Sequence, residues 1–197
     1  MEEAWLDRAG IFRRFHSATF EEIERRGMPH DMRIRANYAK VKEYAGGMEA
    51  NVRDGIGLIL CGGYGTMKTT MAVAVLRQWL DTGHGGMLVP MCSLMDNLYT
   101  MRISCTEEWA RYERRVRSTP LLVLDDLGGE NTDQSWVLAK VDSIVTERYN
   151  RMLPLIVTTN LTEKELAGTY SGRIMDRLRS TSRLLTFGGV SQREAAR

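Results

Sequence analysis

The stretch LILCGGYGTMKTTMA, residues 58–72, determines how the rest of the sequence is interpreted. It opens with an apolar run, passes through three glycines, and ends in Lys-Thr-Thr at the start of an amphipathic segment. A strand, a glycine-rich loop and a helix in this order are typical of the phosphate-binding motif G-x-x-x-x-G-K-[ST], because the N–H groups at a helix N-terminus bind anions. Met67 departs from the motif, since it stands where the second glycine belongs.

The positions of this loop predict a site for ATP and Mg²⁺. We expect Lys68 to reach the β- and γ-phosphates and the Thr69 hydroxyl to reach the metal. Met67 is tolerated if its φ is negative and its side chain points away from the phosphates, and otherwise it weakens the site. The alternative is a glycine-rich turn before an ordinary helix. The predicted nucleotide-binding residues of the loop are Gly62, Gly63, Tyr64, Gly65, Thr66, Met67, Lys68, Thr69 and Thr70.

Short apolar runs alternate with longer amphipathic segments along the whole chain. This alternation predicts a parallel sheet covered by helices. We expect strands at residues 57–61, 87–91, 120–126, 153–160 and 183–187, and helices at residues 68–80, 93–102, 106–118, 133–151, 162–170 and 172–180.

Polar side chains follow two of the predicted strands. Asp125 and Asp126 end the most uniformly apolar run, where a carboxylate can reach a nucleotide-bound Mg²⁺ and a second one can polarise the attacking water. Thr158, Thr159 and Asn160 end the next run, and the amide there could hold water or the γ-phosphate. The alternatives are a solvated strand end and a cap for the following helix.

Arginines gather on two predicted helices. Arg173 and Arg177 share one helical face at i, i+4, where they are either solvated or available to stabilise phosphoryl-transfer charge in a neighbouring subunit. Arg111, Arg114 and Arg115 are interleaved with aromatic residues, which predicts either a groove for single-stranded DNA or a solvated helix whose aromatics face the core. The segments FRRF (12–15) and ERRG (24–27) have the same ambiguity.

The composition sets limits on partners and location. The chain has 197 residues and a formal net charge of +2, so a nucleic acid would be bound by a local patch rather than by the whole surface. Cys61, Cys92 and Cys105 form neither a zinc pattern nor a disulfide framework, which favours a reducing, cytoplasmic setting. No apolar run is long enough to predict a membrane span or a signal peptide.

The order of these motifs from about Ala9 to Arg193 resembles the AAA+ ATPase domain of the DnaC/DnaI helicase loaders and the IstB-type transposition ATPases. The resemblance lies in GLILCGGYGTMKTTMAVAV (Walker A), LLVLDDLGGE (Walker B), ERYNRMLPLIVTTNLTEKEL (sensor 1), GRIMDRLRS (arginine finger) and the final SQR. It implies an α/β P-loop NTPase: a three-layer αβα sandwich with a parallel five-stranded sheet, order 5-1-4-3-2, and no full C-terminal helical lid. Residues 1–19 are then a short extension or linker, and residues 20–197 the AAA+ domain.

The resemblance also implies roles for individual residues. These are Lys68 and Thr69 on the phosphates and Mg²⁺, Asp125 on Mg²⁺, Asp126 as water-activating acid, Asn160 as sensor 1, Arg177 as a trans-acting arginine finger with Arg173 nearby, Phe20 near the adenine and Arg193 as a reader of the nucleotide state.

The function implied is that of a slow ATPase that assembles on single-stranded DNA as a nucleotide-dependent homo-oligomer and loads a DnaB-type replicative helicase. Because the region before the ATFEEI segment (18–23) is short, either another surface binds the helicase or the partner differs. One alternative is an IstB-type transposition helper acting on duplex DNA. Another is a scaffold that binds nucleotide weakly and does not hydrolyse it.

Overall fold

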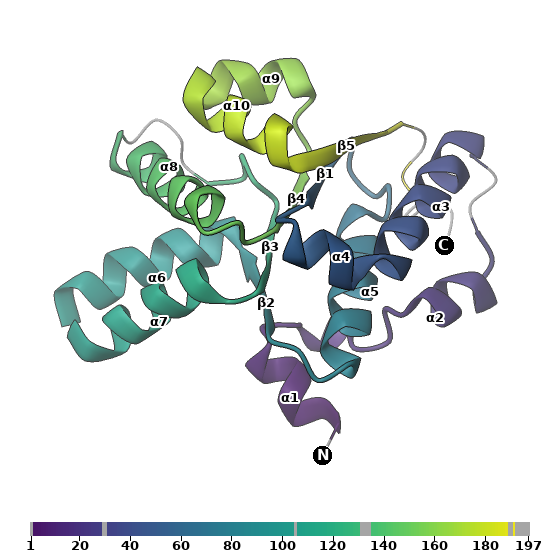
Figure 1. Ribbon diagram of the computed structural model, residues 1–197, viewed down its shortest axis with the longest axis horizontal. Helices are drawn as coiled ribbons and strands as arrows, with labels where there is room; N and C mark the ends of the chain where they lie inside the picture. Colours follow the sequence, from purple (N-terminus) through teal and green to yellow (C-terminus); the bar gives the residue numbers. More distant parts are fainter. Residues whose placement is uncertain (1, 29–30, 105, 131–134, 189–190, 192–197) are drawn as a thin grey trace.

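Five parallel strands form the centre of the computed structural model, which describes residues 2–28, 31–104, 106–130, 135–188 and 191 (Figure 1). The strand order is β2-β3-β4-β1-β5, which confirms the predicted 5-1-4-3-2 sheet. Every predicted strand is present, with its bounds shifted by two residues at most. The strands are β1 (Gly57–Gly62), β2 (Gly86–Pro90), β3 (Leu121–Asp125), β4 (Leu155–Thr159) and β5 (Ser182–Phe187).

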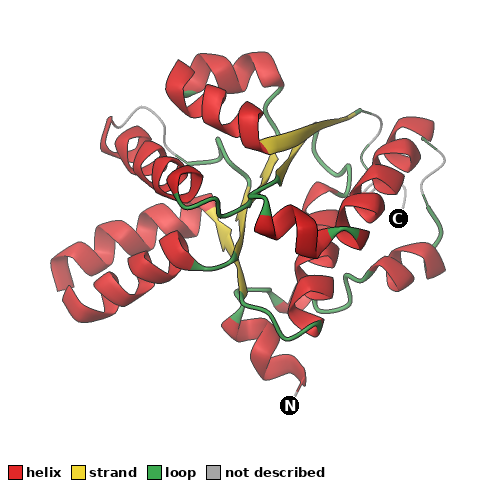
Figure 2. Ribbon diagram, viewed as in Figure 1, coloured by secondary structure: helices red, strands yellow, loops and turns green. Residues whose placement is uncertain are grey.

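Helices cover both faces of this sheet (Figure 2). They are α1 (Glu2–Arg8), a 3₁₀ turn (Arg13–Phe15), α2 (Phe20–Arg25), α3 (Met32–Gly46), α4 (Met48–Arg53), α5 (Lys68–Asp81), α6 (Met91–Ser104), α7 (Thr106–Ser118), α8 (Ser135–Asn150), α9 (Glu163–Thr169) and α10 (Gly172–Thr181). In the described ranges no helix is both long and apolar enough to cross a membrane.

Side chains alternate between two core clusters along the interior strand β1. Leu58 and Leu60 pack into a first cluster with α3 and α5, whereas Ile59 packs into a second with α6, α8 and α10. All six residues of β1 are buried, as expected for a parallel strand covered on both faces. The apolar run in the sequence therefore reflects burial on two sides.

The sheet order also brings three strand ends together. β4 lies between β1 and β3, and the register pairs Cys61 with Thr159 and Leu124 with Val157. The loop after β1, the acids after β3 and the polar end of β4 consequently meet at one edge. This is the carboxyl edge, where ligands bind in open α/β sheets.

The region before β1 forms helices that the sequence analysis did not predict. Leu6, Ala9 and Ile11 are buried in the first core cluster, and the Leu88 N–H of β2 donates to the Ala9 carbonyl at 2.8 Å. Residues 2–19, expected as an extension or linker, thus pack on the domain beside β2. The α2 helix begins at a Thr19 N-cap whose hydroxyl accepts from the Glu22 N–H.

Candidate nucleotide-binding site

Glycine is sterically required at two positions of the loop between β1 and α5. Gly62 and Gly65 have φ values of 139° and 72°, in the region that favours glycine. A Cβ atom on Gly62 would collide with the Phe187 carbonyl, and one on Gly65 would collide with the Ser191 hydroxyl. The backbone here has no room for another residue type.

Met67 adopts a left-handed conformation at the N-cap of α5, with φ 68° and ψ 11°. The condition of a negative φ is therefore not met, and the residue keeps a glycine-like backbone at a cost of about 1–2 kcal/mol. Met67 is half-buried, packs against the first core cluster and also lines the cavity beside the loop. The loop thus retains its shape at an energetic cost.

Lys68 places a buried ammonium group in the loop. Its Nζ donates to the carbonyls of Gly62 and Gly63, both at 2.7 Å, and to Asn160 Oδ1 at 3.0 Å. The residue is 6% exposed, so the charge lies at the floor of the site. Thr66 is buried beside it and donates from its hydroxyl to the Gly63 carbonyl.

The two hydroxyl groups nearest to Asp125 come from neighbouring elements. Its Oδ1 accepts from Thr69 Oγ1 of α5 at 2.8 Å and from Thr158 Oγ1 of β4 at 2.6 Å. Burial raises the pKa of this carboxyl above its usual value, although the two hydroxyls act in the opposite direction. A partly buried carboxylate next to a threonine hydroxyl suits a cation that arrives with its own phosphate ligands.

Asn160 joins the lysine of the loop to the second acid. Its Oδ1 accepts from Lys68, and its Nδ2 donates to Asp126 Oδ1 at 2.5 Å. Asp126 has φ 60°, a conformation that aspartate tolerates better than most residues, and its N–H donates to Thr158 Oγ1 at 2.9 Å. The acid loop is thereby tied to the end of β4.

A buried carboxylate supports this acid loop from behind. Glu130 is 7% exposed, accepts from the Gly128 N–H at 2.8 Å and also accepts from the Tyr170 hydroxyl. Tyr170 caps the end of α9 just before α10, so the loop that carries Asp126 is bonded to the junction of these two helices.

A cavity of about 590 Å³ opens above these groups. Its described lining includes Tyr64, Gly65, Thr66, Met67, Lys68, Thr69, Thr70, Asp125, Asp126, Thr158 and Asn160, together with Arg14, Phe15 and Arg26 from the region before β1. The volume and the glycine-rich helix N-terminus fit a nucleoside triphosphate. The described residues contain no cluster of three His, Cys, Asp or Glu side chains that could bind a metal unaided, so Mg²⁺ would share its ligands with the nucleotide.

The aromatic side chains of the described cavity lining come from the loop and from the region before β1. Phe20, expected near the adenine, is not among the described residues that line the cavity; the residue is 8% exposed, and its ring packs edge-on against Tyr38 with centroids 5.9 Å apart. Among the described residues, the aromatic side chains that line the cavity are Phe15 of the 3₁₀ turn and Tyr64 of the loop.

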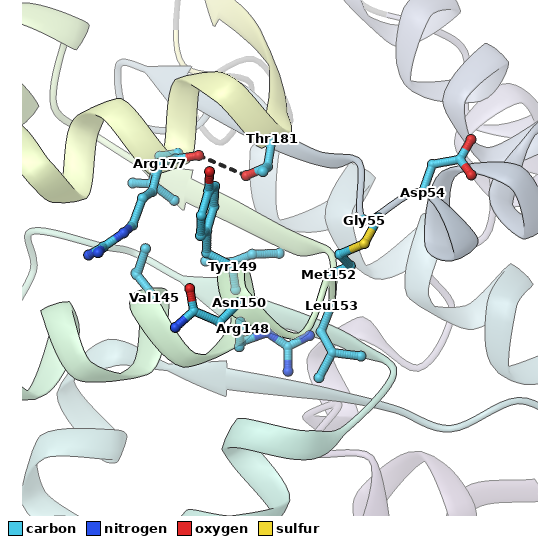
Figure 3. A pocket seen from close by; sticks show the side chains of 12 residues that line it. Asp54, Gly55, Val145, Arg148, Tyr149, Asn150, Met152, Leu153, Arg177 and Thr181 are labelled. Carbon is cyan, nitrogen blue, oxygen red and sulfur yellow. Dashed lines mark hydrogen bonds between the residues drawn. The ribbon is translucent and has the colours of Figure 1, made fainter.

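Two of the three arginines of α10 lie together at a separate surface. Arg173 and Arg177 form ion pairs with Asp142 of α8, and neither is among the described residues that line the nucleotide cavity. Figure 3 shows Arg177 beside Tyr149 and Thr181, at a hollow of about 410 Å³ that also includes Met152.

The family model of the IstB-like ATP binding proteins matches residues 13–197. This chain belongs to that family. It is 31% identical over 122 residues to the replicative helicase loader DnaI of Bacillus subtilis (strain 168), covering 60% of this chain and 38% of DnaI. It is 25% identical over 142 residues to the replicative helicase loader DnaC of Escherichia coli (strain K12), covering 72% of this chain and 56% of DnaC.

The fold of this family member agrees with a solved helicase loader. The crystal structure of the DnaC helicase loader superposes with a TM-score of 0.79 at 23% identity, over 90% of this chain and 100% of that one. The predicted P-loop AAA+ fold is thereby confirmed. The matched segments span little more than half of DnaC and less than half of DnaI, so the sequence similarity covers only part of each full-length relative.

The basic cluster of α7 is exposed, but its aromatic neighbours are partly engaged. Arg111, Arg114 and Arg115 are exposed, and Arg115 Nη2 donates to the Arg8 carbonyl. Trp109 and Tyr112 are half-buried and pack against the second core cluster. A DNA groove at this helix stays a prediction that depends mainly on the arginines.

Some of the cavity lining was not assigned to the nucleotide from sequence. Arg14, Phe15 and Arg26 come from the FRRF and ERRG segments, which sequence alone leaves as basic patches of uncertain role. These three residues reach the cavity because the chain before β1 passes beside the loop between β1 and α5, and no local sequence pattern indicates that path. Arg193 lies outside the described residues, although nearby Ser191 approaches Gly65.

Proposed function

We propose that this IstB-family member is an ATP-dependent replicative helicase loader. It binds ATP with Mg²⁺, hydrolyses it slowly and forms a nucleotide-dependent homo-oligomer on single-stranded DNA in the cytoplasm. The observation that carries the proposal is the continuous set of contacts from Lys68 through Asn160 to Asp126, next to the Asp125–Thr69 pair. The similarity to DnaI and DnaC supports a DnaB-type helicase as partner.

The residues of the cavity divide the work in this proposal. The loop N–H groups and Lys68 hold the phosphates, and Thr69 and Asp125 hold Mg²⁺, which when bound neutralises charge on the phosphate oxygens. Asp126 polarises the attacking water, and Asn160 orients both that water and Lys68. Arg177 of a neighbouring copy, with Arg173 nearby, stabilises the transition-state charge, and Arg193 senses the nucleotide.

Direct binding and turnover measurements test the enzymatic part. Fluorescent ADP and ATP are titrated against the wild type and against Lys68→Ala, and phosphate release is followed with and without single-stranded DNA. We expect micromolar-range binding that the variant loses. Absence of both binding and turnover in the wild type would refute an ATPase.

Purification from the host tests the partner. We expect the replicative helicase to co-purify with the tagged wild type in the presence of ATP and Mg²⁺. Lys68→Ala serves as the matched control, because it should fail to retain the helicase. A transposase in place of the helicase would contradict the loader proposal.

A second candidate is a transposition helper on duplex DNA, which the match to the IstB-like ATP binding proteins keeps in view, whereas the DnaI and DnaC relatives favour the loader. The strandedness of the DNA that stimulates turnover separates the two. A loader responds to single strands, whereas a helper responds to duplexes.

The left-handed Met67 favours a third candidate, a nucleotide-weak scaffold. We expect the wild type to bind nucleotide, because Lys68, Thr69 and both acids are retained. If nucleotide bound to Met67→Gly but not to the wild type, the scaffold would be correct.

A further inference from the structure

Ion pairs link helices α8 and α10 at a surface separate from the nucleotide cavity. We call Asp142, Thr146, Arg173 and Arg177 the α8–α10 brace. Asp142 accepts from Arg173 through Oδ2 and from Arg177 Nη1 through Oδ1 at 3.3 Å. Thr146 Oγ1 accepts from the same Nη1 at 2.5 Å and lies 3.3 Å from Asp142 Oδ1. One nitrogen of Arg177 is therefore held by two groups of α8.

The rest of the Arg177 guanidinium is uncommitted. Among the described residues, its Nε and Nη2 have no hydrogen-bond partner, while its guanidinium carbon lies 5.8 Å from the centre of the Tyr149 ring. The planar fork of arginine recognises phosphate with two parallel N–H groups. The edge suited to such recognition is the one that α8 leaves free.

The brace is not needed to dock α10 on α8. Val141, Ile144 and Val145 of α8 pack in the same apolar cluster as Ile174, Met175 and Leu178 of α10, and each is at most 4% exposed. Asp142 and Arg177, by contrast, have side chains 18% and 19% exposed. A partly buried ion pair is weak evidence for a stabilising role, and the apolar contacts already hold the two helices together.

We infer that Asp142, assisted by Thr146, is a positioning residue that fixes the free edge of Arg177 for the nucleotide site of a neighbouring copy. This inference rests on the proposed function. A long arginine side chain otherwise samples many rotamers, and holding one nitrogen in advance removes much of that freedom before the neighbour docks. Asp142 itself touches no substrate.

Mixed oligomers test the inference. Lys68→Ala copies keep the α8–α10 brace but lack a working nucleotide site, and Arg177→Ala copies have the site but lack the finger. Mixing the two should recover hydrolysis. Asp142→Asn is then placed in either partner of the mixture. In the Lys68→Ala copies we expect it to lower the recovered kcat at least tenfold with KM unchanged; in the Arg177→Ala copies we expect no change.

Thr146 provides a matched pair of variants. Thr146→Val in the Lys68→Ala copies removes the hydroxyl and should lower the recovered kcat severalfold, whereas Thr146→Ser keeps the hydroxyl and should preserve it. Thermal melts of each variant check that the fold is intact.

The outcomes separate the inference from the function on which it rests. Failure of the parental mixture to recover activity would overturn the trans site, and the inference with it. Recovery that is insensitive to Asp142→Asn in the Lys68→Ala copies, or equally sensitive in both partners, would overturn the inference alone. A rise in recovered activity would also overturn it, since it would mean that Asp142 sequesters the arginine.

Discussion

The nucleotide cavity and the α8–α10 brace use charged groups in opposite ways. In the cavity, Lys68, Asn160 and Asp126 are bonded to one another across three elements, and the lysine is 6% exposed. In the brace, Arg177 is held at one nitrogen, and its other edge has no partner in the described part of the chain. The charged groups of the cavity are thus bonded within this chain, whereas part of the Arg177 guanidinium is left available to another molecule.

In the proposed function, a second copy supplies what the cavity of one chain lacks. A phosphate entering the cavity meets an ammonium group and two carboxylates that this chain supplies. The described cavity lining includes none of the three arginines of α10, Arg173, Arg177 and Arg179. Binding should therefore belong to one chain, while fast turnover should require two.

The largest expected effect comes from removing Arg177 of the α8–α10 brace. Arg177→Ala should lower hydrolysis by about 10³-fold, the usual contribution of such an arginine, and leave nucleotide affinity within about twofold. Phosphate release and fluorescent-nucleotide titration measure the two quantities. The control is Arg179→Ala, a change on the same helix as Arg177 that breaks an exposed ion pair with Glu163 of α9. Equal loss of affinity and turnover would contradict the separation.

Removing the ammonium group of Lys68 from the cavity should affect the binding of ATP. Lys68→Ala should weaken ATP binding by about 2–5 kcal/mol, because a buried charge facing the phosphates is lost. Calorimetric titration measures the change, with the exposed Lys164→Ala as control. Unchanged affinity would remove Lys68 from the phosphate site.

Asp125 should lower the folding stability of the nucleotide-free protein. Its pKa is raised in the fold, so the folded state holds its proton more tightly than the unfolded state and stability falls as pH rises from the unfolded value of about 3.9 through the folded value. Asp125→Asn should remove this slope and stabilise the nucleotide-free protein by about 0.5–2 kcal/mol at neutral pH, while abolishing Mg²⁺-dependent hydrolysis. Urea unfolding at several pH values tests both the slope and its sign. Destabilisation at neutral pH would argue that the carboxylate is well compensated.

The smallest effect concerns the loop backbone. Met67→Ile should destabilise the fold by about 1 kcal/mol relative to Met67→Leu, because a β-branched residue tolerates φ 68° poorly. Met67→Gly should remain close to the wild type, since relief of strain is offset by lost packing and by the freedom of glycine in the unfolded chain. Thermal or urea melts of the three variants decide. Indifference to branching would mean that the loop relaxes.

Sequence predicted what depends on local pattern and missed what depends on distant geometry. The strands could be predicted because burial on both faces leaves apolar runs, and Lys68, Asp125 and Asn160 could be grouped because each follows a strand. Helix α3 also carried a signal, since Ile34, Tyr38 and Val41 recur at helical spacing and are buried.

Other features had no local signal. The φ of Met67 is imposed by the loop around it, and the place of Phe15 depends on where the chain crosses that loop. The contact between Asp142 and Arg177 joins residues on two helices separated by 35 positions, and neither helix reveals it alone.

The position of β1 between β4 and β5 sets the order in which this protein can be completed during synthesis. Leu58 pairs with Ile156 on one side and with Arg183 on the other, and Gly62 packs against the Phe187 carbonyl. Until residues 182–187 of a nascent chain have left the ribosome, one edge of β1 has no partner strand. An apolar strand edge exposed in this way is prone to aggregation. The glycine-rich loop is encoded in the first half of the chain, yet it acquires its final walls only after β5 has emerged from the ribosome.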